Sequence, residues 1–204
     1  PKPRVFRFPI HRVIVNRYGF NSVGARVGSG RIARLNREYP KCRMPRGISI
    51  GKNQKTPEEK AVQDYLAAFR EFLPVMRRYD WLKVNISSPN TEGLRDIFER
   101  LEEFLGEFIE GAEVIAAELE RPMPALVIKV PPDDLEPKDY ERVVRIAARA
   151  GFRGVEGVNT TTDEKLKRTL GLFEADGRTP IAGGVSGPPL FGKALATLMA
   201  MRDA

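Results

Sequence analysis

The stretch W-L-K-V-N-I-S-S-P-N-T (81–91) passes directly from an apolar segment into a row of neutral polar residues. W-L-K-V is apolar apart from Lys83, and residues 81–86 predict a short buried strand. The polar row has two interpretations. It is either an ordinary turn rich in Asn, Ser and Pro, or a binding site made of amide and hydroxyl groups.

The same succession of a short apolar segment and a polar run occurs at three other places. G-K-N-Q follows residues 47–50, P-P-D-D follows 125–130, and N-T-T-T follows 154–158. Helical patterns lie between these segments, and short apolar strands that alternate with helices predict a parallel sheet with helices outside. Because the carboxyl ends of parallel strands build the ligand site in such folds, the polar runs are expected to meet there.

The expected helices have recognisable boundaries. The first three are expected at 21–38, from Pro57 to about Arg78, and at 97–119. A fourth follows P-P-D-D-L-E-P-K-D-Y and ends at about Ala150, and the last follows a glycine-rich turn at 181–190. Thr56 and Glu59 are expected to form a capping box, and Pro74 to kink or break its helix. Residues 1–20 are expected to be an irregular, basic entry segment.

Two α/β architectures fit this order, a Rossmann-like sheet and a (β/α)8 barrel. The sequence contains no G-x-G-x-x-G motif and no P-loop, which favours the barrel. A full barrel takes roughly 250 residues and eight units, and about half of the units are visible here. The predicted fold is therefore a TIM-type barrel of which residues 1–204 form the central part, as one domain.

Composition excludes several kinds of site. The chain has one cysteine, Cys42, so an internal disulfide and a multi-cysteine metal site are excluded. It has one histidine, His11, which is expected at the surface, so neither a Ser-His-Asp triad nor a metal site is predicted. The net charge of +7 attracts phosphates and acidic molecules. No zinc-finger spacing or RNA-binding aromatic motif is present, so no specific nucleic acid is predicted.

The polar runs contain candidate binding groups. Asn85, Ser88 and Asn90 lie within six residues, and planar amides suit a flat heterocycle with alternating C=O and N–H groups. Without a histidine to activate it, Ser88 could act only as a positioned general base. Asn159, Thr160 and Thr161 repeat the theme, although they could equally cap a helix.

Lys129 is the only charged residue in A-L-V-I-K-V-P. A lysine in a buried strand needs a partner, because unpaired burial of a charge is costly. An anionic cofactor would serve as that partner. Alternatively, Lys129 lies at the edge of the strand and reaches solvent.

Six motifs stand in a fixed order along the chain, preceded by P-R-V-F-R-F-P (3–9). They are N-R-Y-G-F-N (16–21), I-G-K-N (50–53), V-N-I-S-S-P-N-T-E-G-L-R (84–95), V-I-K-V-P-P-D (127–133), V-N-T-T (158–161) and G-G-V-S-G-P-P-L (183–190). In order and spacing they resemble the dihydroorotate dehydrogenase family, over essentially all 204 residues.

The resemblance implies an FMN-dependent (β/α)8 barrel that oxidises dihydroorotate to orotate in pyrimidine biosynthesis. Class 1 members carry Cys as the catalytic base. Class 2 members carry Ser and pass electrons to a membrane quinone, so Ser88 makes this chain similar to class 2. Ser88 is then expected to take the proton from C5 of the substrate while a hydride leaves from C6 to the flavin.

The resemblance also implies the binding residues. The substrate-binding residues are expected to be Asn16, Arg17, Tyr18, Gly19, Phe20, Asn85, Asn90, Asn159 and Thr160. The flavin-binding residues are expected to be Asn85, Lys129 and Gly187, together with Ser49 and Val158. At these last two positions the family usually has Asn and Thr, and each lost hydrogen bond is worth about 0.5–1.5 kcal/mol.

Some parts of the family pattern have no counterpart in these residues. They are the N-terminal strand, the C-terminal segments that bind the FMN phosphate, and the membrane-binding helices. The enzyme is therefore expected to be seen in part, with peripheral contact to a bacterial or mitochondrial inner membrane through segments outside this chain. The alternative is a flavin-free paralogue that serves as a structural subunit of a larger assembly, such as an RNA-rich one.

Overall fold

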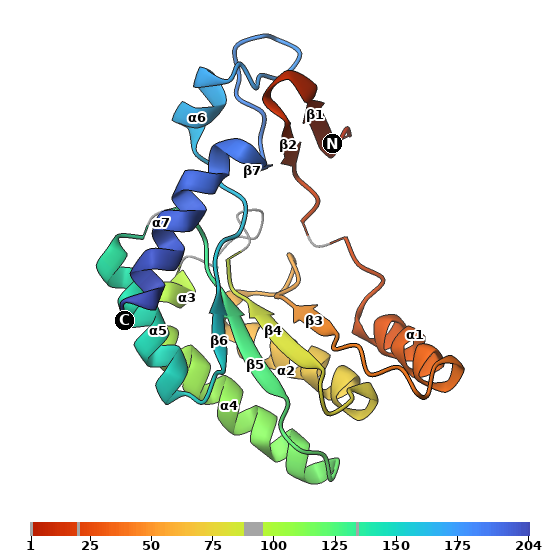
Figure 1. Cartoon of the computed structure of the whole chain (residues 1–204). Coiled ribbons are helices and arrows are strands. Elements are labelled where there is room, and N and C mark those ends of the chain that lie inside the picture. The colour runs from red at the N-terminus through yellow and green to blue at the C-terminus, as the bar shows by residue number, and fades with distance from the viewer. Residues whose placement is uncertain (1, 20, 88–95, 134) are drawn as a thin grey trace.

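Four parallel strands form the main sheet of the computed structural model, which describes residues 2–19, 21–87, 96–133 and 135–204 (Figure 1). The strands pair in chain order: β3 (Gly47–Ile50), β4 (Trp81–Asn85), β5 (Ala125–Lys129) and β6 (Gly154–Glu156). This uninterrupted order is that of a (β/α) barrel, whereas a doubly wound sheet reverses its strand order at a switch point. All four predicted strands are confirmed.

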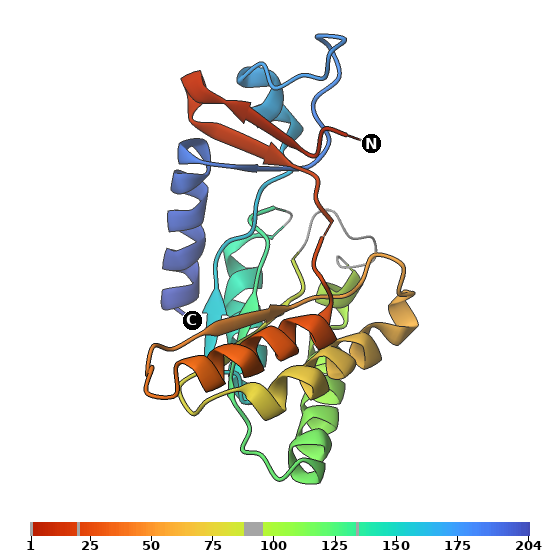
Figure 2. The ribbon, with the colours of Figure 1, turned by 90° about the vertical axis from the view of Figure 1, so that its right-hand side faces the viewer.

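Helices pack against one face of this sheet. The helices are α1 (Ala25–Glu38), α2 (Ala61–Phe72), α3 (Asp96–Glu99), α4 (Leu101–Glu118), α5 (Pro137–Arg149), α6 (Glu164–Thr169) and α7 (Phe191–Arg202). Single turns of 3-10 helix accompany them: η1 (Pro9–His11), η2 (Glu58–Lys60), η3 (Leu73–Val75) and η4 (Pro188–Leu190). Helices α2, α4 and α5 cover the sheet, α1 packs on α2, and α7 packs on α5 (Figures 1 and 2).

Side-chain alternation along the strands explains why one face is covered. Ile48, Leu82 and Leu126 are buried in the main core against the helices. The residues two positions further along each strand are buried there too: Ile50, Val84 and Ile128. The residues between them point to the opposite face, called the inner face below. The inner face carries polar and charged residues instead.

A second, antiparallel sheet lies beyond the carboxyl ends of the main strands (Figures 1 and 2). It consists of β1 (Val5–Phe8), β2 (Val13–Asn16) and β7 (Gly184–Ser186). A small core of Val13, Val15, Leu172, Ile181 and Val185 lies beneath it. The prediction of an irregular segment at residues 1–20 was therefore wrong, and the glycine-rich turn contains a strand. Val13, Ile14 and Val15 are all apolar, so the sequence did not show that Val13 and Val15 are buried while Ile14 is exposed.

Several predicted helix boundaries differ from those in the structure, and one is confirmed. Thr56 forms no capping box, because η2 follows Pro57 and α2 begins only at Ala61. The break at Pro74 is confirmed, since α2 ends at Phe72 and Pro74 lies in η3. The helix expected at 97–119 is divided at Arg100 into α3 and α4, and α6 was not predicted.

A buried carboxylate joins the start of β4 to the segment before β3. Asp80 accepts hydrogen bonds from the backbone and guanidinium nitrogens of Arg46 and from the backbone N–H of Arg77. Burial alone would raise the pKa of Asp80, but these hydrogen bonds outweigh it and hold the pKa below its usual value. The ionised form of Asp80 therefore stabilises the fold.

Replacement of Asp80 by Asn is expected to lower the free energy of unfolding by about 1.5–3 kcal/mol at neutral pH, the usual contribution of a hydrogen-bonded charge. Because the folded-state pKa is depressed, this stabilisation is present above the unfolded-state pKa of about 3.9. It is lost as the pH falls through the folded-state pKa. Urea unfolding of both proteins over this range tests the expectation, with the exposed Asp203→Asn as the control. A stability difference that does not shrink in acid would contradict it.

Candidate active site

Two rows of side chains lie on the inner face where the strands end. In the outer row, Asn85 pairs in register with Lys129, and Lys129 pairs with Glu156. In the row below, Ser49 pairs with Lys83, and Lys83 pairs with Val127. Residues in register, or two apart along a strand, point to the same face of a sheet. The structure therefore brings together three of the predicted flavin-binding residues: Asn85, Lys129 and Ser49.

The partner of Lys129 is a carboxylate of the protein itself. Glu156 accepts hydrogen bonds from Lys83 Nζ at 2.9 and 2.8 Å, and its Oε1 lies 3.2 Å from Lys129 Nζ. Burial would raise the pKa of Glu156, but the two lysines outweigh it and hold the pKa below its usual value. Sequence reasoning missed Lys83 and Glu156, although each is a charged residue inside a short strand.

Neutral polar groups form a second cluster beside this charged one. Oδ1 of Asn85 accepts hydrogen bonds from the N–H and hydroxyl groups of Ser87, at 3.2 and 2.9 Å. Nδ2 of Asn159 donates to the carbonyl and hydroxyl oxygens of Ser87, at 2.8 and 3.1 Å. Ser87, which the sequence analysis did not select, thus joins the ends of β4 and β6.

The surroundings hold this cluster in place. The hydroxyl of Tyr65 donates to the carbonyl of Asn85 at 2.8 Å, and burial raises the pKa of Tyr65, so the phenol stays protonated. Nδ2 of Asn85 makes no hydrogen bond to another residue that the structure describes, and it is not fully buried. One amide donor therefore stays available on the inner face, next to Lys129.

The segment after β6 is not a simple helix cap. Asn159 Oδ1 accepts from the N–H of Thr160, but the cap of α6 is Asp163, whose side chain accepts from the N–H of Leu166. The helix-capping interpretation of Asn159 and Thr160 was therefore wrong. Val158 lies on the same segment and offers no polar side chain.

Asp133 ties this segment to its neighbours. Its carboxylate accepts hydrogen bonds from Thr161 Oγ1 at 2.6 Å, from the N–H of Thr162 at 2.7 Å and from Lys193 Nζ at 2.6 Å. Burial would raise the pKa of Asp133, but Lys193 and the two threonines hold it below its usual value. The loops after β5 and β6 and helix α7 are thus joined through one charge.

A separate group of predicted residues lies on the small sheet. Asn16 ends β2 and pairs with Gly184, Tyr18 is exposed, and Gly19 follows with a φ of 63°. Arg17 is bound within this part of the protein, because its Nη1 donates to Glu174 at 2.6 Å and its guanidinium lies over the ring of Phe6. Among the described residues, no hydrogen bond joins Asn16, Arg17, Tyr18 or Gly19 to Asn85 or Asn159.

Gly187 is required by packing within the protein. A Cβ at this position would lie 2.4 Å from the carbonyl oxygen of Arg12, and φ is 124°, so no other residue fits without strain. This contact with the backbone of Arg12 accounts for the glycine.

Three further predicted residues, Ser88, Asn90 and Phe20, lie outside the described residues.

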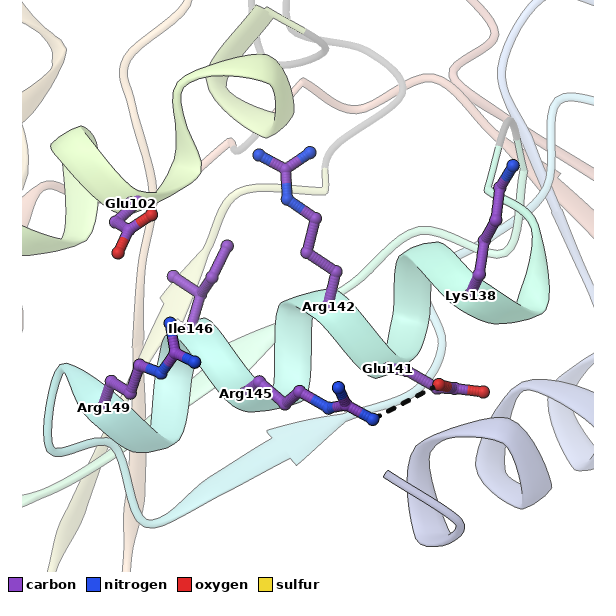
Figure 3. Close-up of a pocket in the computed structure, with 7 residues that line it drawn as sticks. All are labelled: Glu102, Lys138, Glu141, Arg142, Arg145, Ile146 and Arg149. Atoms are coloured by element: carbon purple, nitrogen blue, oxygen red, sulfur yellow. Dashed lines mark ion pairs between the residues drawn. The ribbon is translucent and has the colours of Figure 1, made fainter.

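A basic groove runs along α5 on the outside of the protein. Lys138, Arg142, Arg145 and Arg149 form one stripe, and Glu102 of α4 faces it across a cavity of about 250 Å³ (Figure 3). Arg145 lies 3.6 Å from Glu141. Within the part of the chain that the structure describes, Lys138, Arg142 and Arg149 make no ion pair.

The sequence profile of the dihydroorotate dehydrogenase family matches residues 1–204. The chain belongs to this family. Two relatives, both named dihydroorotate dehydrogenase (quinone), come from Xanthomonas campestris pv. campestris (strain B100) and Mycolicibacterium paratuberculosis (strain ATCC BAA-968 / K-10). They are 37% and 35% identical to this chain over 204 and 198 residues, which are 99% and 97% of it.

The chain spans about half the length of these dihydroorotate dehydrogenases, 54% and 48% respectively. The TIM-type barrel predicted from sequence is confirmed for the family, and the described residues supply four consecutive parallel strands of it. Enzymes of this family use a flavin. None of the helices in the described ranges has the length and apolar character needed to cross a bilayer.

Replacement of Ser87 by Ala is expected to destabilise the fold by about 1–2 kcal/mol, because two hydrogen bonds of the buried hydroxyl are lost. Urea unfolding measures the change. Ser186→Ala is the matched control, since it removes a hydroxyl whose one hydrogen bond, 3.3 Å long, is exposed. Equal effects of the two substitutions would show that Ser87 does not hold Asn85 and Asn159 together.

Proposed function

We propose that this chain forms part of an FMN-dependent dihydroorotate dehydrogenase of the quinone type. The reaction is the oxidation of dihydroorotate to orotate in de novo pyrimidine biosynthesis, with quinone as the final electron acceptor. Family membership and the cluster of neutral amides at the strand ends support this proposal. The observation that carries it is the position of Asn85. Asn85 pairs in register with Lys129 on one side, and the hydroxyl of Ser87 links it by hydrogen bonds to Asn159 on the other.

The residues on the inner face fit the ring of a flavin. Such a ring presents carbonyl oxygens and ring nitrogens along one edge, and it becomes anionic when reduced. The Nδ2 group of Asn85 and the ammonium of Lys129 supply a neutral donor and a cation side by side on the same face. Ser49 adds a hydroxyl one row below. Val158 adds no hydrogen bond, so it would contact the ring by packing alone.

The substrate would lie over the neutral cluster. Asn85, Asn90, Asn159 and Thr160 would orient the pyrimidine ring and its carboxylate, with help from Asn16 to Phe20. Bound FMN supplies a two-electron acceptor for the hydride that leaves C6 of dihydroorotate. Ser88 would receive the proton from C5, which balances the removal of two hydrogens from the C5–C6 bond.

Quinones dissolve in the bilayer, so the proposed function requires contact with a membrane. We place the enzyme at a bacterial or mitochondrial inner membrane, attached through segments outside this chain. The positive net charge of +7 is compatible with an anionic membrane surface.

Replacement of Ser88 by Ala is expected to lower kcat by about 10²–10⁴-fold, the usual contribution of a general base. Binding of FMN and orotate should be unchanged, because the amides and Lys129 remain. Steady-state assays with dihydroorotate and a soluble quinone, together with titrations of both ligands, measure these effects. Unchanged turnover would refute Ser88 as the base.

The groove on α5 favours a second candidate function. Lys138, Arg142 and Arg149, which form no ion pair with another described residue, lie on one exposed helix face and would bind a polyanion, as a flavin-free subunit of an RNA-rich assembly requires. If this function holds, Arg142→Glu should weaken binding of an RNA duplex and reduce the salt dependence of the binding constant. Lys165→Glu on α6 is the charge-matched control. Binding that does not distinguish the two variants would reject the groove as an RNA site.

A further inference from the structure

Among the residues that the structure describes on the inner face, two are lysines and one is an acid. Lys83, Lys129 and Glu156 together carry a net charge of +1 in a partly buried cluster, with side chains 17%, 19% and 32% exposed. A lone Lys129–Glu156 pair would be neutral, and would leave no cation for an anionic ligand. The charge of Lys83 therefore decides whether the cluster can bind an anion.

Geometry indicates which lysine is the main counter-ion of Glu156. Lys83 Nζ contacts both carboxylate oxygens, at 2.9 and 2.8 Å, whereas Lys129 Nζ approaches only Oε1, at 3.2 Å. Lys83 reaches Glu156 diagonally over β5, where Val127 lies between them in register with Lys83. Lys83 also lies 5.7 Å from the ring centre of Trp81, which fixes its side chain further.

The position of Lys129 differs from that of Lys83. It stands beside Asn85 in the row nearest the strand ends, and its one ion-pair contact among the described residues is the longer one to Glu156. An ammonium has three donors, so Lys129 keeps donors available for a ligand while Glu156 restrains its direction.

We propose that Lys83 and Glu156 are positioning residues for Lys129. Glu156 holds the ammonium of Lys129 beside Asn85, and Lys83 neutralises Glu156, so that the positive charge of Lys129 remains for the anionic edge of a flavin. This inference rests on the proposed function. It adds two residues to the site that act on the flavin only through Lys129.

Opposite effects are expected from the two substitutions. Lys83→Met leaves Glu156 to neutralise Lys129, so the affinity for reduced FMN should fall by about tenfold, the order of one unit charge in a partly exposed site. Glu156→Gln removes the competing charge but keeps a side-chain oxygen that can hold Lys129 in place, so the affinity for reduced FMN should rise. Through the two-electron couple, a tenfold change corresponds to about 30 mV in the midpoint potential, downward for Lys83→Met and upward for Glu156→Gln.

The experiment uses the full-length protein as its host makes it. Quenching of flavin fluorescence gives the dissociation constant of oxidised FMN, and a redox titration gives the midpoint potential. Lys165→Met and Glu118→Gln change the net charge by the same amounts at exposed sites, and they should leave both quantities unchanged. If the wild type binds FMN and the two cluster variants shift the potential in the same direction, or not at all, the inference is overturned while the proposed function stands.

If the wild type binds no flavin, the proposed function is rejected. A second measurement then tests the assignment of Lys83 as the counter-ion of Glu156. Double-mutant cycles of urea unfolding give the coupling of Glu156 to Lys83 and to Lys129 separately. The assignment of Lys83 as counter-ion predicts the larger coupling for the Lys83 pair. A coupling that is equal, or larger for Lys129, would overturn it.

Discussion

The parallel register of β3 to β6 is the constraint on which the rest of the structure depends. Side chains alternate between the two faces of each strand, so the register that buries Ile48, Leu82 and Leu126 against the helices also turns Ser49, Lys83 and Val127 to the inner face. A shift of one residue would bury two lysines in the core and expose the isoleucines and leucines. The hydrophobic core and the candidate site are therefore fixed by the same pairing.

This register also explains how charge is tolerated inside short strands. Lys129 alone would be an unpaired cation on a largely buried surface, which is costly. Glu156 on the neighbouring strand removes that cost, and Lys83 balances the acid. The neutral cluster of Asn85, Ser87 and Asn159 lies directly beside these charges, so a ligand that spans both must be flat, rich in hydrogen-bonding groups and negatively charged along one edge. Flavin and orotate have these properties.

The sequence predicted the main sheet well, because each of its strands is a short apolar run followed by polar residues. It also predicted that Asn85 and Asn159 would meet, since the carboxyl ends of parallel strands share one edge. It could not predict the partner of Lys129. Glu156 lies 27 positions further along the chain, and only the register of β5 and β6 brings the two together. Ser87 was missed because Ser88 stands next to it and the pattern does not separate them.

The small sheet escaped prediction for a related reason. Its third strand, β7, is separated from β2 by most of the chain, so local patterns near residues 1–20 gave no sign of pairing. Arg17 and Gly187 illustrate the consequence. Both belong to motifs that suggest ligand binding, yet Arg17 forms an ion pair with Glu174, and Gly187 packs against the backbone of Arg12.

We propose that the ends of β4, β5 and β6 hold a flavin against dihydroorotate. Anaerobic addition of dihydroorotate to the full-length protein loaded with FMN tests this most directly, with the visible absorption of the flavin as the readout. We expect the absorption to bleach and one orotate to form for each flavin that is reduced. A protein that retains its flavin colour in the presence of dihydroorotate would contradict it.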